Sequence, residues 1–462
     1  MDLAALKIDI AEVPTEENPQ LVLQKSRDFY WYSPVLKRQL DSVKADIVAR
    51  PRNEDELLLV VGACFKNEVP LTVRGSGTGN YGQAMPLAGG LVLDLCNMNR
   101  VIEVKNGTVV AEPGAILADI DKVTRPTGQE LRMFPSTYHT ASIGGFIAGG
   151  SGGVGSVRWG GLRDVGNIVR VKMAAMDGSI PTVLDLSGRD INRVSHAYGT
   201  TGVITEVEMP LAPAVEWVDL ITAFPTLEAA VHHGEALAAA DGLLLKNVAV
   251  MDAAIAPYLR RHKPYLPDGE AFVVTIAASF AAGDVAALGK RAGGRVVLRT
   301  DTLEAEARSR LPPAFELSWN HTTLRALRMD PDITYLQVLY PQPGIAGKVL
   351  KMSALLGEEA PTHLEFVRFD GAVGCFGLPL VRFTTEERLD EIIALHEDNG
   401  CPIFNPHRYT LEEGGMKQTD PLQLGFKRRS DPKGLLNPGK MIAWDDPDFD
   451  YGRPYLFPSL SA

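Results

Sequence analysis

Cysteine is scarce in this sequence, and the cysteines are not spaced like metal ligands or like the pairs of a disulfide framework. The 462 residues include four cysteines, Cys64, Cys96, Cys375 and Cys401, and no two of them form a C-x-x-C pair. This arrangement implies neither a zinc site nor a disulfide framework. No two of the nine histidines stand at metal-ligand spacing, because His232 and His233 are adjacent and point about 100° apart on a helix. We expect no metal site.

Positive charge and long apolar runs are also lacking. The chain has 46 Lys and Arg against 57 Asp and Glu, a net charge of −11, and its longest basic run is 427–429. An acidic chain without basic clusters argues against nucleic acid or an anionic membrane as partner. No run of about 18 apolar residues predicts a membrane-spanning helix. Neither a basic region nor an apolar stretch marks a secretory signal at the N-terminus, so we expect a cytoplasmic protein.

Glycine, by contrast, is concentrated in a few segments. A short β-like run, 71–74, enters a loop with glycine at positions 75, 77, 79 and 82. Glycine has no Cβ, so such a loop adopts positive φ angles and turns its backbone N–H groups toward a ligand. Clustered N–H groups bind anions, and the usual anion is a phosphate or pyrophosphate.

The residues after this loop exclude two familiar phosphate sites. No lysine follows the loop before Gly90, which excludes a P-loop. A G-x-G-x-x-G pattern ends at Gly82, but Pro86 argues against the helix that a Rossmann site needs, and 91–95 reads as a buried strand. The segment therefore predicts strand–loop–strand, with the anion held by backbone amides alone. A purely structural glycine-rich turn stays open for this segment taken by itself.

Three further segments follow in a recognisable order. They are Phe134–Gly155, rich in glycine, Tyr198–Glu206, and Ser430–Lys440 near the C-terminus. In this order and spacing the four segments resemble the vanillyl-alcohol-oxidase-type (PCMH-type) flavoproteins, in the branch of FAD-linked oxidases and flavin 2-hydroxyacid dehydrogenases. The resemblance implies FAD as cofactor.

The resemblance also implies a two-domain α+β fold. We expect an N-terminal segment at 1–44, an FAD-binding PCMH-type domain at 45–213, a substrate-binding cap domain at 214–400, and a C-terminal segment at 401–462 that returns to the flavin. The pattern within the cap favours an antiparallel sheet covered by helices. Helices are expected over 227–240, 284–291 (with Asp284 as cap) and 387–399, and strands over 272–276, 295–298, 333–338 and 364–369.

Cofactor-binding residues follow from the match to the family's segments. The residues that the resemblance assigns to FAD are Arg74, Gly75, Ser76, Gly77, Thr78, Gly79, Pro135, Ser136, Ser142, Gly144, Gly145, Gly202, Ile204, Asn437 and Lys440. Many relatives carry, at the position of Thr78, a histidine that bonds covalently to the flavin. A hydroxyl is a poor nucleophile for that bond, so we expect non-covalent FAD.

Flavin dehydrogenation also needs a proton acceptor, and a histidine has a suitable pKa. His407 is the favoured base, because it resembles the position of the active-site Glu-His pair of the 2-hydroxyacid dehydrogenases. Pro406 occupies the Glu position, so part of that pattern is missing. Tyr409 is an alternative acid or base, and a structural role for His407 stays open. The other histidines at positions 196, 262 and 396 lie in polar contexts and are expected to be solvated.

Five further residues are candidates for the substrate side: His321, Tyr335, His363, Arg368 and Asn405. For each, core packing or a surface role stays open. We expect an FAD-dependent oxidoreductase that moves hydride from a small organic alcohol or hydroxyacid to flavin N5, with oxygen or a carrier as electron acceptor and a homo-oligomer as a possible assembly. Two alternatives remain: a non-redox FAD-dependent synthase of the alkyl-glycerone-phosphate type and a non-enzymatic flavin-binding protein.

Overall fold

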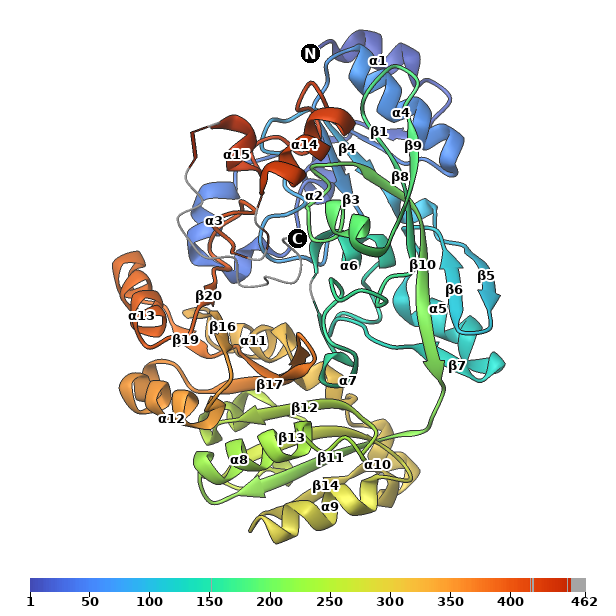
Figure 1. Cartoon of the computed structure of the whole chain (residues 1–462). Coiled ribbons are helices and arrows are strands. Elements are labelled where there is room, and N and C mark those ends of the chain that lie inside the picture. Colours follow the sequence, from blue (N-terminus) through green and yellow to red (C-terminus); the bar gives the residue numbers. More distant parts are fainter. Residues whose placement is uncertain (151, 416, 418, 447, 450–462) are drawn as a thin grey trace.

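The computed structural model describes residues 1–150, 152–415, 417, 419–446 and 448–449. Within these residues, the chain begins with a small sheet of order β1-β2-β4-β3, in which β2, β4 and β3 are parallel and β1 is antiparallel (Figure 1). The strands are β1 (Thr15–Glu16), β2 (Ile47–Ala49), β3 (Leu71–Arg74) and β4 (Leu91–Asp94). The accompanying helices are α1 (Leu3–Asp9), α2 (Pro19–Lys25), α3 (Pro34–Leu40) and α4 (Glu54–Lys66).

Helix α4 forms because its start is capped and one face is apolar. The Asn53 side chain accepts a hydrogen bond from the Glu56 N–H at 3.0 Å, which satisfies one of the free donors of the first turn. The apolar side chains of Leu57, Val60 and Val61 are fully buried and pack with α1 and the small sheet. The cap and the buried apolar face together explain why this segment is helical.

A larger antiparallel sheet follows. Its order in the described residues is β5-β6-β10-β8-β9, and β7 pairs with the far end of β10. The strands are β5 (Val101–Lys105), β6 (Thr108–Ala111), β7 (Gln129–Leu131), β8 (Arg170–Ala174), β9 (Val183–Ser187) and β10 (Val203–Pro213). The helices of this region are α5 (Leu117–Thr124), α6 (Ile143–Gly149) and α7 (Ser156–Trp159).

The first glycine-rich loop connects two parallel strands. β3 and β4 pair in parallel from Leu71 opposite Leu91 to Arg74 opposite Asp94, and residues 75–90 join them without a helix. The predicted strand–loop–strand arrangement is therefore confirmed. Because β3 ends at Arg74, the loop lies at the carboxyl end of this strand.

The second half of the chain forms a larger sheet, which we call the cap sheet. Its order in the described residues is β14-β11-β13-β12-β17-β18-β16-β20, and all its pairings are antiparallel. The strands are β11 (Trp217–Phe224), β12 (Leu245–Met251), β13 (Ala271–Ala278), β14 (Arg295–Arg299), β16 (Gln337–Tyr340), β17 (His363–Phe369), β18 (Ala372–Gly377) and β20 (Ile403–Phe404). A separate pair consists of β15 (Ile333–Tyr335) and β19 (Leu380–Arg382).

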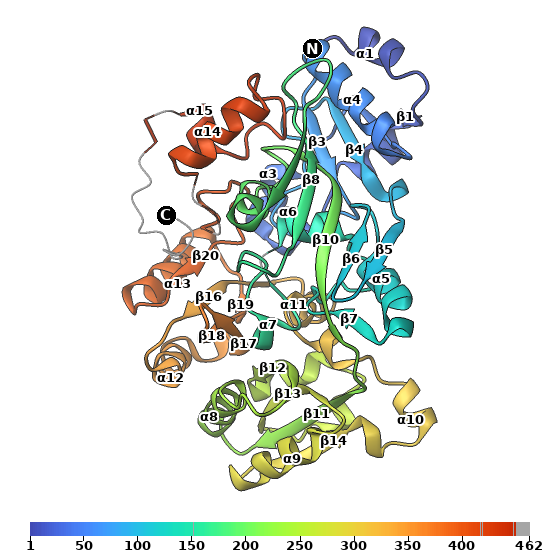
Figure 2. The same ribbon diagram turned by 45° about the vertical axis from the view of Figure 1, so that its right-hand side comes forward.

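Both faces of the cap sheet are covered, which explains the continuous apolar sequence of β13. On one face Val273 and Ala277 pack with helices α8 (Leu227–Ala238), α9 (Ala282–Arg291), α12 (Ile345–Leu356) and α13 (Glu386–Asp398). On the other face Phe272, Val274 and Ile276 join the core of the N-terminal half. Side chains alternate across a strand, so a strand covered on both sides has no polar face. Figure 2 shows the helices on the outer side of the sheet.

Two sequence predictions for this half need correction. The expected strand over 333–338 is two strands, because the chain leaves β15 at Tyr335 and enters the cap sheet at Gln337. Asp284 is not the cap of α9: the helix begins at Ala282, and Asp284 lies in its first turn. An acidic side chain there still interacts favourably with the helix dipole. The remaining helices of this half are the short α10 (Ala305–Ser309) and α11 (Asn320–Leu327).

The C-terminal segment returns to the N-terminal half. Helices α14 (Pro421–Ser430) and α15 (Ile442–Asp445) lie beside the first sheet in Figures 1 and 2. The Leu71 N–H donates to the Leu435 carbonyl and the Asn437 N–H donates to the Leu71 carbonyl, both at 2.8 Å, so the segment extends the edge beside β3. Residues 450–462 of the predicted C-terminal segment lie outside the described residues. No helix in the described part of the chain is long and apolar enough to cross a membrane.

Candidate functional site

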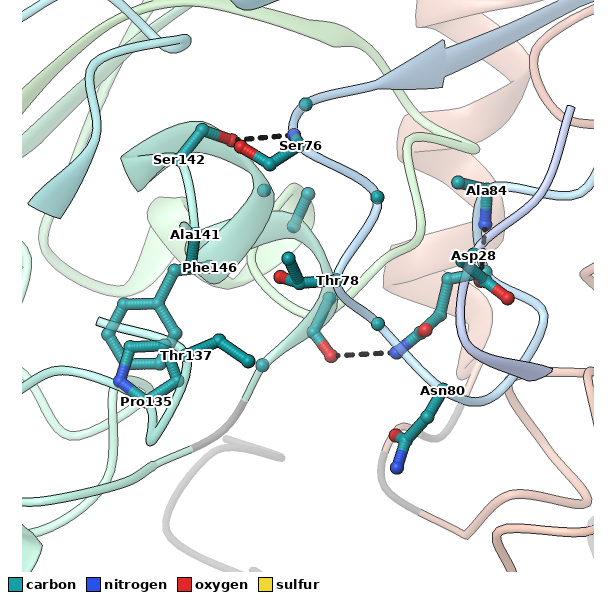
Figure 3. Close-up of a pocket in the computed structure, with 18 of the residues that line it drawn as sticks. Asp28, Ser76, Thr78, Asn80, Ala84, Pro135, Thr137, Ala141, Ser142 and Phe146 are labelled. Atoms are coloured by element: carbon teal, nitrogen blue, oxygen red, sulfur yellow. Dashed lines mark hydrogen bonds between the residues drawn. The ribbon is translucent and has the colours of Figure 1, made fainter. Parts of the chain in front are cut away.

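A cavity lies where the two glycine-rich segments face each other and meet the cap. Figure 3 shows Ser76 and Thr78 of the first loop on one side and Pro135, Thr137 and Ser142 on the other. The cap contributes the wall residues Trp319, Asn320, His321 and Gln337, and the N-terminal segment contributes Asp28, Phe29 and Tyr32. Of the residues predicted to bind FAD, Gly75, Ser76, Gly77, Thr78, Gly79, Pro135, Ser136, Ser142, Gly144, Gly145, Gly202 and Ile204 all line this cavity.

The first loop presents backbone N–H groups to this cavity. In the described part of the chain, no acceptor is found for the N–H groups of Gly77, Thr78 and Gly79, all three of which lie in the cavity wall. These three residues are only partly buried, and their unpaired N–H groups in the cavity wall are available to an acceptor from a ligand. Such a row of donors is a site for a phosphate or pyrophosphate.

The two glycine-rich segments meet at a contact that only glycine allows. The Ser142 hydroxyl accepts a hydrogen bond from the Ser76 N–H at 3.3 Å. A Cβ atom on Gly75 would lie 2.1 Å from the same hydroxyl oxygen, far inside van der Waals contact. The Ser76 hydroxyl is itself buried and has no partner among the described residues. A narrow cradle with free amides and a free hydroxyl fits the pyrophosphate of FAD.

Three predicted cofactor residues lie behind the cavity wall and do not line it. The Arg74 guanidinium donates to the carbonyls of Arg27 and Ser76, the latter at 3.2 Å, and so holds the loop from below. The buried Lys440 ammonium donates to the Gly82 carbonyl at 2.6 Å. Asn437 donates from Nδ2 to the carbonyls of Gln83 (2.8 Å) and Tyr198 (2.7 Å). Asn437 and Lys440 of the C-terminal motif thus fix the shape of the cavity from behind its wall, and neither residue lines the cavity.

His407, the predicted base, is sealed inside the protein. Its side chain is 2% exposed, Nδ1 lies 2.7 Å from the Ser33 hydroxyl, and Nε2 lies 2.9 Å from the Tyr335 carbonyl, to which it can only donate. Burial lowers the pKa of His407 to about 4. His407 does not line the cavity, so this geometry does not fit the predicted catalytic role. It fits the structural role that the sequence left open, because the imidazole joins the N-terminal segment to β15.

The alternative, Tyr409, is also outside the cavity lining. Its ring lies 4.8 Å from the Lys440 ammonium and packs with Leu36, Leu40 and Met85. Asn405, predicted on the substrate side, accepts a hydrogen bond from the His407 N–H at 2.9 Å through Oδ1 and likewise does not line the cavity.

Of the other predicted substrate residues, only His321 reaches the cavity. The Tyr335 hydroxyl accepts a hydrogen bond from Asn80 Nδ2 at 2.8 Å behind the wall. His363 is fully buried against Glu365, and Arg368 pairs with the exposed carboxylate of Asp241. His321 belongs to α11, and its Nδ1 lies 3.9 Å from Glu316 Oε2. Burial lowers the pKa of His321 to about 4.

Sequence reasoning missed the contribution of the N-terminal segment. Asp28 lines the cavity and accepts hydrogen bonds from the N–H groups of Tyr30 (2.9 Å) and Ala84 (3.2 Å). Burial raises the pKa of Asp28 to about 6, and burial lowers the pKa of nearby Lys440 to about 7. The aromatic cluster at 29–32 was a visible signal, but its place against the cavity depends on long-range packing.

The prediction that three histidines are solvated is wrong. His262 and His396 are 3% and 1% exposed, and His196 is partly buried and lines the cavity. Burial lowers the pKa of each, to about 3 for His196 and about 4 for His262. Polar neighbours in the sequence misled the prediction, because a neighbour in sequence can point to the opposite side of the backbone. Among the described residues, no group of three or more His, Cys, Asp or Glu side chains is placed to hold a metal ion.

Comparison with known proteins identifies an FAD-binding domain in the part of the chain that carries the two glycine-rich segments. Residues 45–183 match the model of the FAD binding domain family FAD_binding_4. The glycolate oxidase subunit GlcD of Bacillus subtilis (strain 168) is 32% identical over 37% of this chain, and the chain spans only 38% of the length of that relative. The D-lactate dehydrogenase of Archaeoglobus fulgidus is 24% identical over 86% of this chain and 91% of its own length.

Among solved structures, an alkyldihydroxyacetonephosphate synthase superposes with a TM-score of 0.72, at 14% identity over 95% of this chain and 86% of that one. At this identity the likeness concerns the fold alone. The family match and the sheets described above confirm the predicted PCMH-type α+β fold and FAD as the cofactor.

Proposed function

We propose that this FAD-linked chain, whose residues 45–183 form the FAD-binding domain, removes hydride and a proton from the C–OH group of a small alcohol or hydroxyacid. FAD supplies the hydride acceptor at its N5 atom when bound. The observation that carries the proposal is one cavity that combines a row of free backbone amides with a neutral histidine from the cap. Glycolate oxidase and D-lactate dehydrogenase, the names of two relatives, support a hydroxyacid.

The chain's own residues bind and enclose the cofactor. The N–H groups of Gly77, Thr78 and Gly79 would donate to the pyrophosphate oxygens of a bound FAD, and Gly145 of α6 lines the same cavity without a side chain. The cap residues Trp319 and Gln337 line the cavity from the other side. A site between two parts of a chain is a common place for a bound cofactor.

The substrate proton goes to His321. Nδ1 of His321 faces the Glu316 carboxylate, which leaves Nε2 to accept a proton. Burial lowers the pKa of His321 to about 4, so the imidazole is neutral near pH 7 with a lone pair available, and it is a weaker base than an exposed histidine. His407 fits this role less well, since both of its ring nitrogens already have partners inside the protein.

Anaerobic mixing of the yellow protein with a panel of alcohols, hydroxyacids and amines tests the proposal. We expect one hydroxyacid to bleach the flavin band, and admission of air then separates an oxidase from a dehydrogenase. His321→Gln should slow bleaching by roughly 10²- to 10⁴-fold, the usual contribution of a general base, while FAD content stays unchanged. His232→Gln, on the exposed face of α8, is the matched control. Bleaching at the original rate in His321→Gln removes this residue from the mechanism.

If no member of the panel bleaches the flavin, redox chemistry on these substrates is excluded and a synthase or a binding protein remains. The synthase alternative needs cationic groups in the cap for a substrate phosphate. Two arginines of the cap already have carboxylate partners, since Arg325 pairs with Glu316 and Arg368 pairs with Asp241. This pairing favours the redox function.

Non-covalent binding of FAD is a separate prediction. Thr78 lines the cavity at the position of the family's covalent histidine, and its hydroxyl does not form that bond. We therefore expect acid precipitation of the holoprotein to leave a colourless pellet and to release all the FAD to the supernatant. Absorbance near 450 nm that stays with the denatured chain would contradict this prediction.

A further inference from the structure

Three consecutive residues of the cap line the FAD cavity, although they lie at the start of a helix. They are Trp319, Asn320 and His321, and α11 begins at Asn320. Consecutive residues of a regular helix point about 100° apart, so they do not normally share one cavity wall. The backbone of Trp319 adopts φ +53° and ψ −143°, a conformation that residues with a side chain rarely adopt. The direction in which His321 leaves the cap is therefore set at this unusual turn.

A buried carboxyl group of the cap sheet holds the turn. The Trp319 N–H donates to Glu365 Oε1 at 2.7 Å, at the short end of the usual range for such a bond. Glu365 belongs to β17 and is 1% exposed. Unusual backbone conformations persist only where the surrounding structure holds them in place. The bond from Trp319 to Glu365 is one such restraint.

His363 fixes the Glu365 side chain in turn. Nε2 of His363 lies 2.9 Å from Glu365 Oε1, and the His363 side chain is fully buried. The two residues are two positions apart on β17, so their side chains leave the same face of the strand. Their neighbours Leu364 and Phe366 point the other way and pack with the outer helices. The pair therefore lies on the inner face of the cap sheet, toward the turn.

The adjacent strand holds the residue before the turn. Asn247 of β12 donates from Nδ2 to the Ser318 hydroxyl at 3.0 Å, and both residues are buried. β12 pairs with β17 and places Ala249 opposite Glu365. Two neighbouring strands of the cap sheet thus restrain residues 318 and 319.

Stability alone does not explain the pair on β17. Oε2 of Glu365 and Nδ1 of His363 are buried and have no hydrogen-bond partner among the described residues. A buried carboxyl group that is only half satisfied costs stability, whereas an apolar side chain of similar size would pack without that cost. Such an arrangement beside a cavity is expected where it places a group that the cavity uses.

We propose that Glu365, supported by His363, is a positioning residue: it holds the turn at Trp319 and thereby fixes His321 in the wall of the FAD cavity. The inference rests on the proposed function, in which His321 is the base. Glu365 acts through the backbone of Trp319, because neither Glu365 nor His363 lines the cavity. Misplacement of a catalytic group by about 1 Å costs roughly 10²-fold in rate, so a firmly held turn matters to the reaction.

Imidazole NMR of the holoprotein tests the positioning without any turnover. The signal of His321 is identified by its loss in His321→Gln. Burial lowers the pKa of His321 to about 4 from an ordinary value of 6.5, so the wild-type signal should hardly move between about pH 5 and pH 8. In Glu365→Leu the turn relaxes and water reaches His321, so its pKa should rise and its signal should titrate in this range. The charged groups that act on His321 are Glu316, Arg325 and Arg328, and all variants keep them.

Two further variants control this measurement. Glu365→Gln keeps an acceptor oxygen for the Trp319 N–H and should behave like the wild type. Phe366→Leu is the matched control, because Phe366 lies on the same strand, is 2% exposed and packs with the outer helices. It should lower the stability of the protein and leave the titration of His321 unchanged. If Glu365→Leu does not fold, Glu365→Asp replaces it, since its carboxyl group is one methylene farther from the Trp319 N–H.

Reduction of the flavin by a substrate that bleaches the wild-type protein is the second measurement. Glu365→Leu should lower the limiting rate by about 10- to 100-fold, while a titration of the apoprotein should show unchanged affinity for FAD. The proposal is overturned by an unchanged limiting rate, by a wild-type titration of His321 in Glu365→Leu, or by an equal shift in Phe366→Leu or Glu365→Gln. If no substrate bleaches the wild type while the His321 signal follows the variants, the proposed function fails and the positioning of His321 stands.

Discussion

Gly75→Val will yield folded protein that binds FAD more weakly and is isolated with less of its yellow colour. At this position even a Cβ would lie 2.1 Å from the Ser142 hydroxyl, and the next atoms are the Ser142 Cβ at 3.4 Å and the Gly145 Cα at 3.5 Å. A valine must therefore push the first loop away from α6 and spread the amide cradle. Overpacking of this kind costs about 1 to 3 kcal/mol, which corresponds to roughly a 5- to 150-fold loss of FAD affinity.

The ratio of flavin to protein absorbance and a titration of the apoprotein with FAD measure this effect. Gly347→Val is the matched control, because a Cβ there meets nothing within 4 Å in helix α12. A second comparison isolates the contact: Gly75→Ala should weaken FAD binding, and Ser142→Ala in the same chain should restore part of the affinity by removing the oxygen that clashes. An unchanged affinity in Gly75→Val would show that the two segments do not close on the cofactor.

Asn437→Ala is expected to destabilise the whole protein and to release FAD. The side chain is 1% exposed, and its Nδ2 group is the donor to two carbonyls, those of Gln83 and Tyr198. Each buried carbonyl that loses its donor costs about 1 to 3 kcal/mol. The backbone adopts φ +43°, which asparagine tolerates better than alanine, and this adds to the loss. We expect the free energy of unfolding to fall by roughly 2 to 6 kcal/mol.

Thermal unfolding of the apoprotein and the holoprotein, followed by circular dichroism, measures this loss. Gln83 and Tyr198 both line the cavity, so the loss of their common donor should also weaken FAD binding. Asn97→Ala is the control, because Asn97 is exposed and its side chain makes only a 3.5 Å contact with the Arg50 carbonyl. Equal melting temperatures for Asn437→Ala and Asn97→Ala would mean that the C-terminal motif does not hold the cavity together.

The sequence predicts the role of Gly75 better than the role of Asn437. The clash at Gly75 follows from a glycine pattern that is visible in one short segment, and the residues predicted from 75–79 all line the cavity. The role of Asn437 was foreseen only in part: the motif was expected to return to the flavin, and the structure places it behind the wall. Its register against β3 is a long-range contact that no local pattern encodes.

The choice of the catalytic base depends even more on long-range contacts that the sequence does not show. His407 and His321 both satisfied the chemical requirement for a base, and their neighbours in sequence do not distinguish them. The packing of the N-terminal segment encloses His407, while α11 carries His321 to the cavity beside Trp319. Asp28 enters the same wall from the N-terminal segment, in which the sequence predicted no site residue.

The sequence by itself determined the strand–loop–strand cradle, because a backbone-amide site is built within contiguous residues and glycine spacing records it directly. The cofactor followed from the resemblance of four segments to a flavoprotein family. Only the tertiary structure decided which histidine meets the cavity, where the C-terminal motif binds, and how Glu365 comes to hold the turn at Trp319. The physical reason is that each of these features depends on contacts between segments far apart in the chain, and such contacts are set by the packing of sheets and helices.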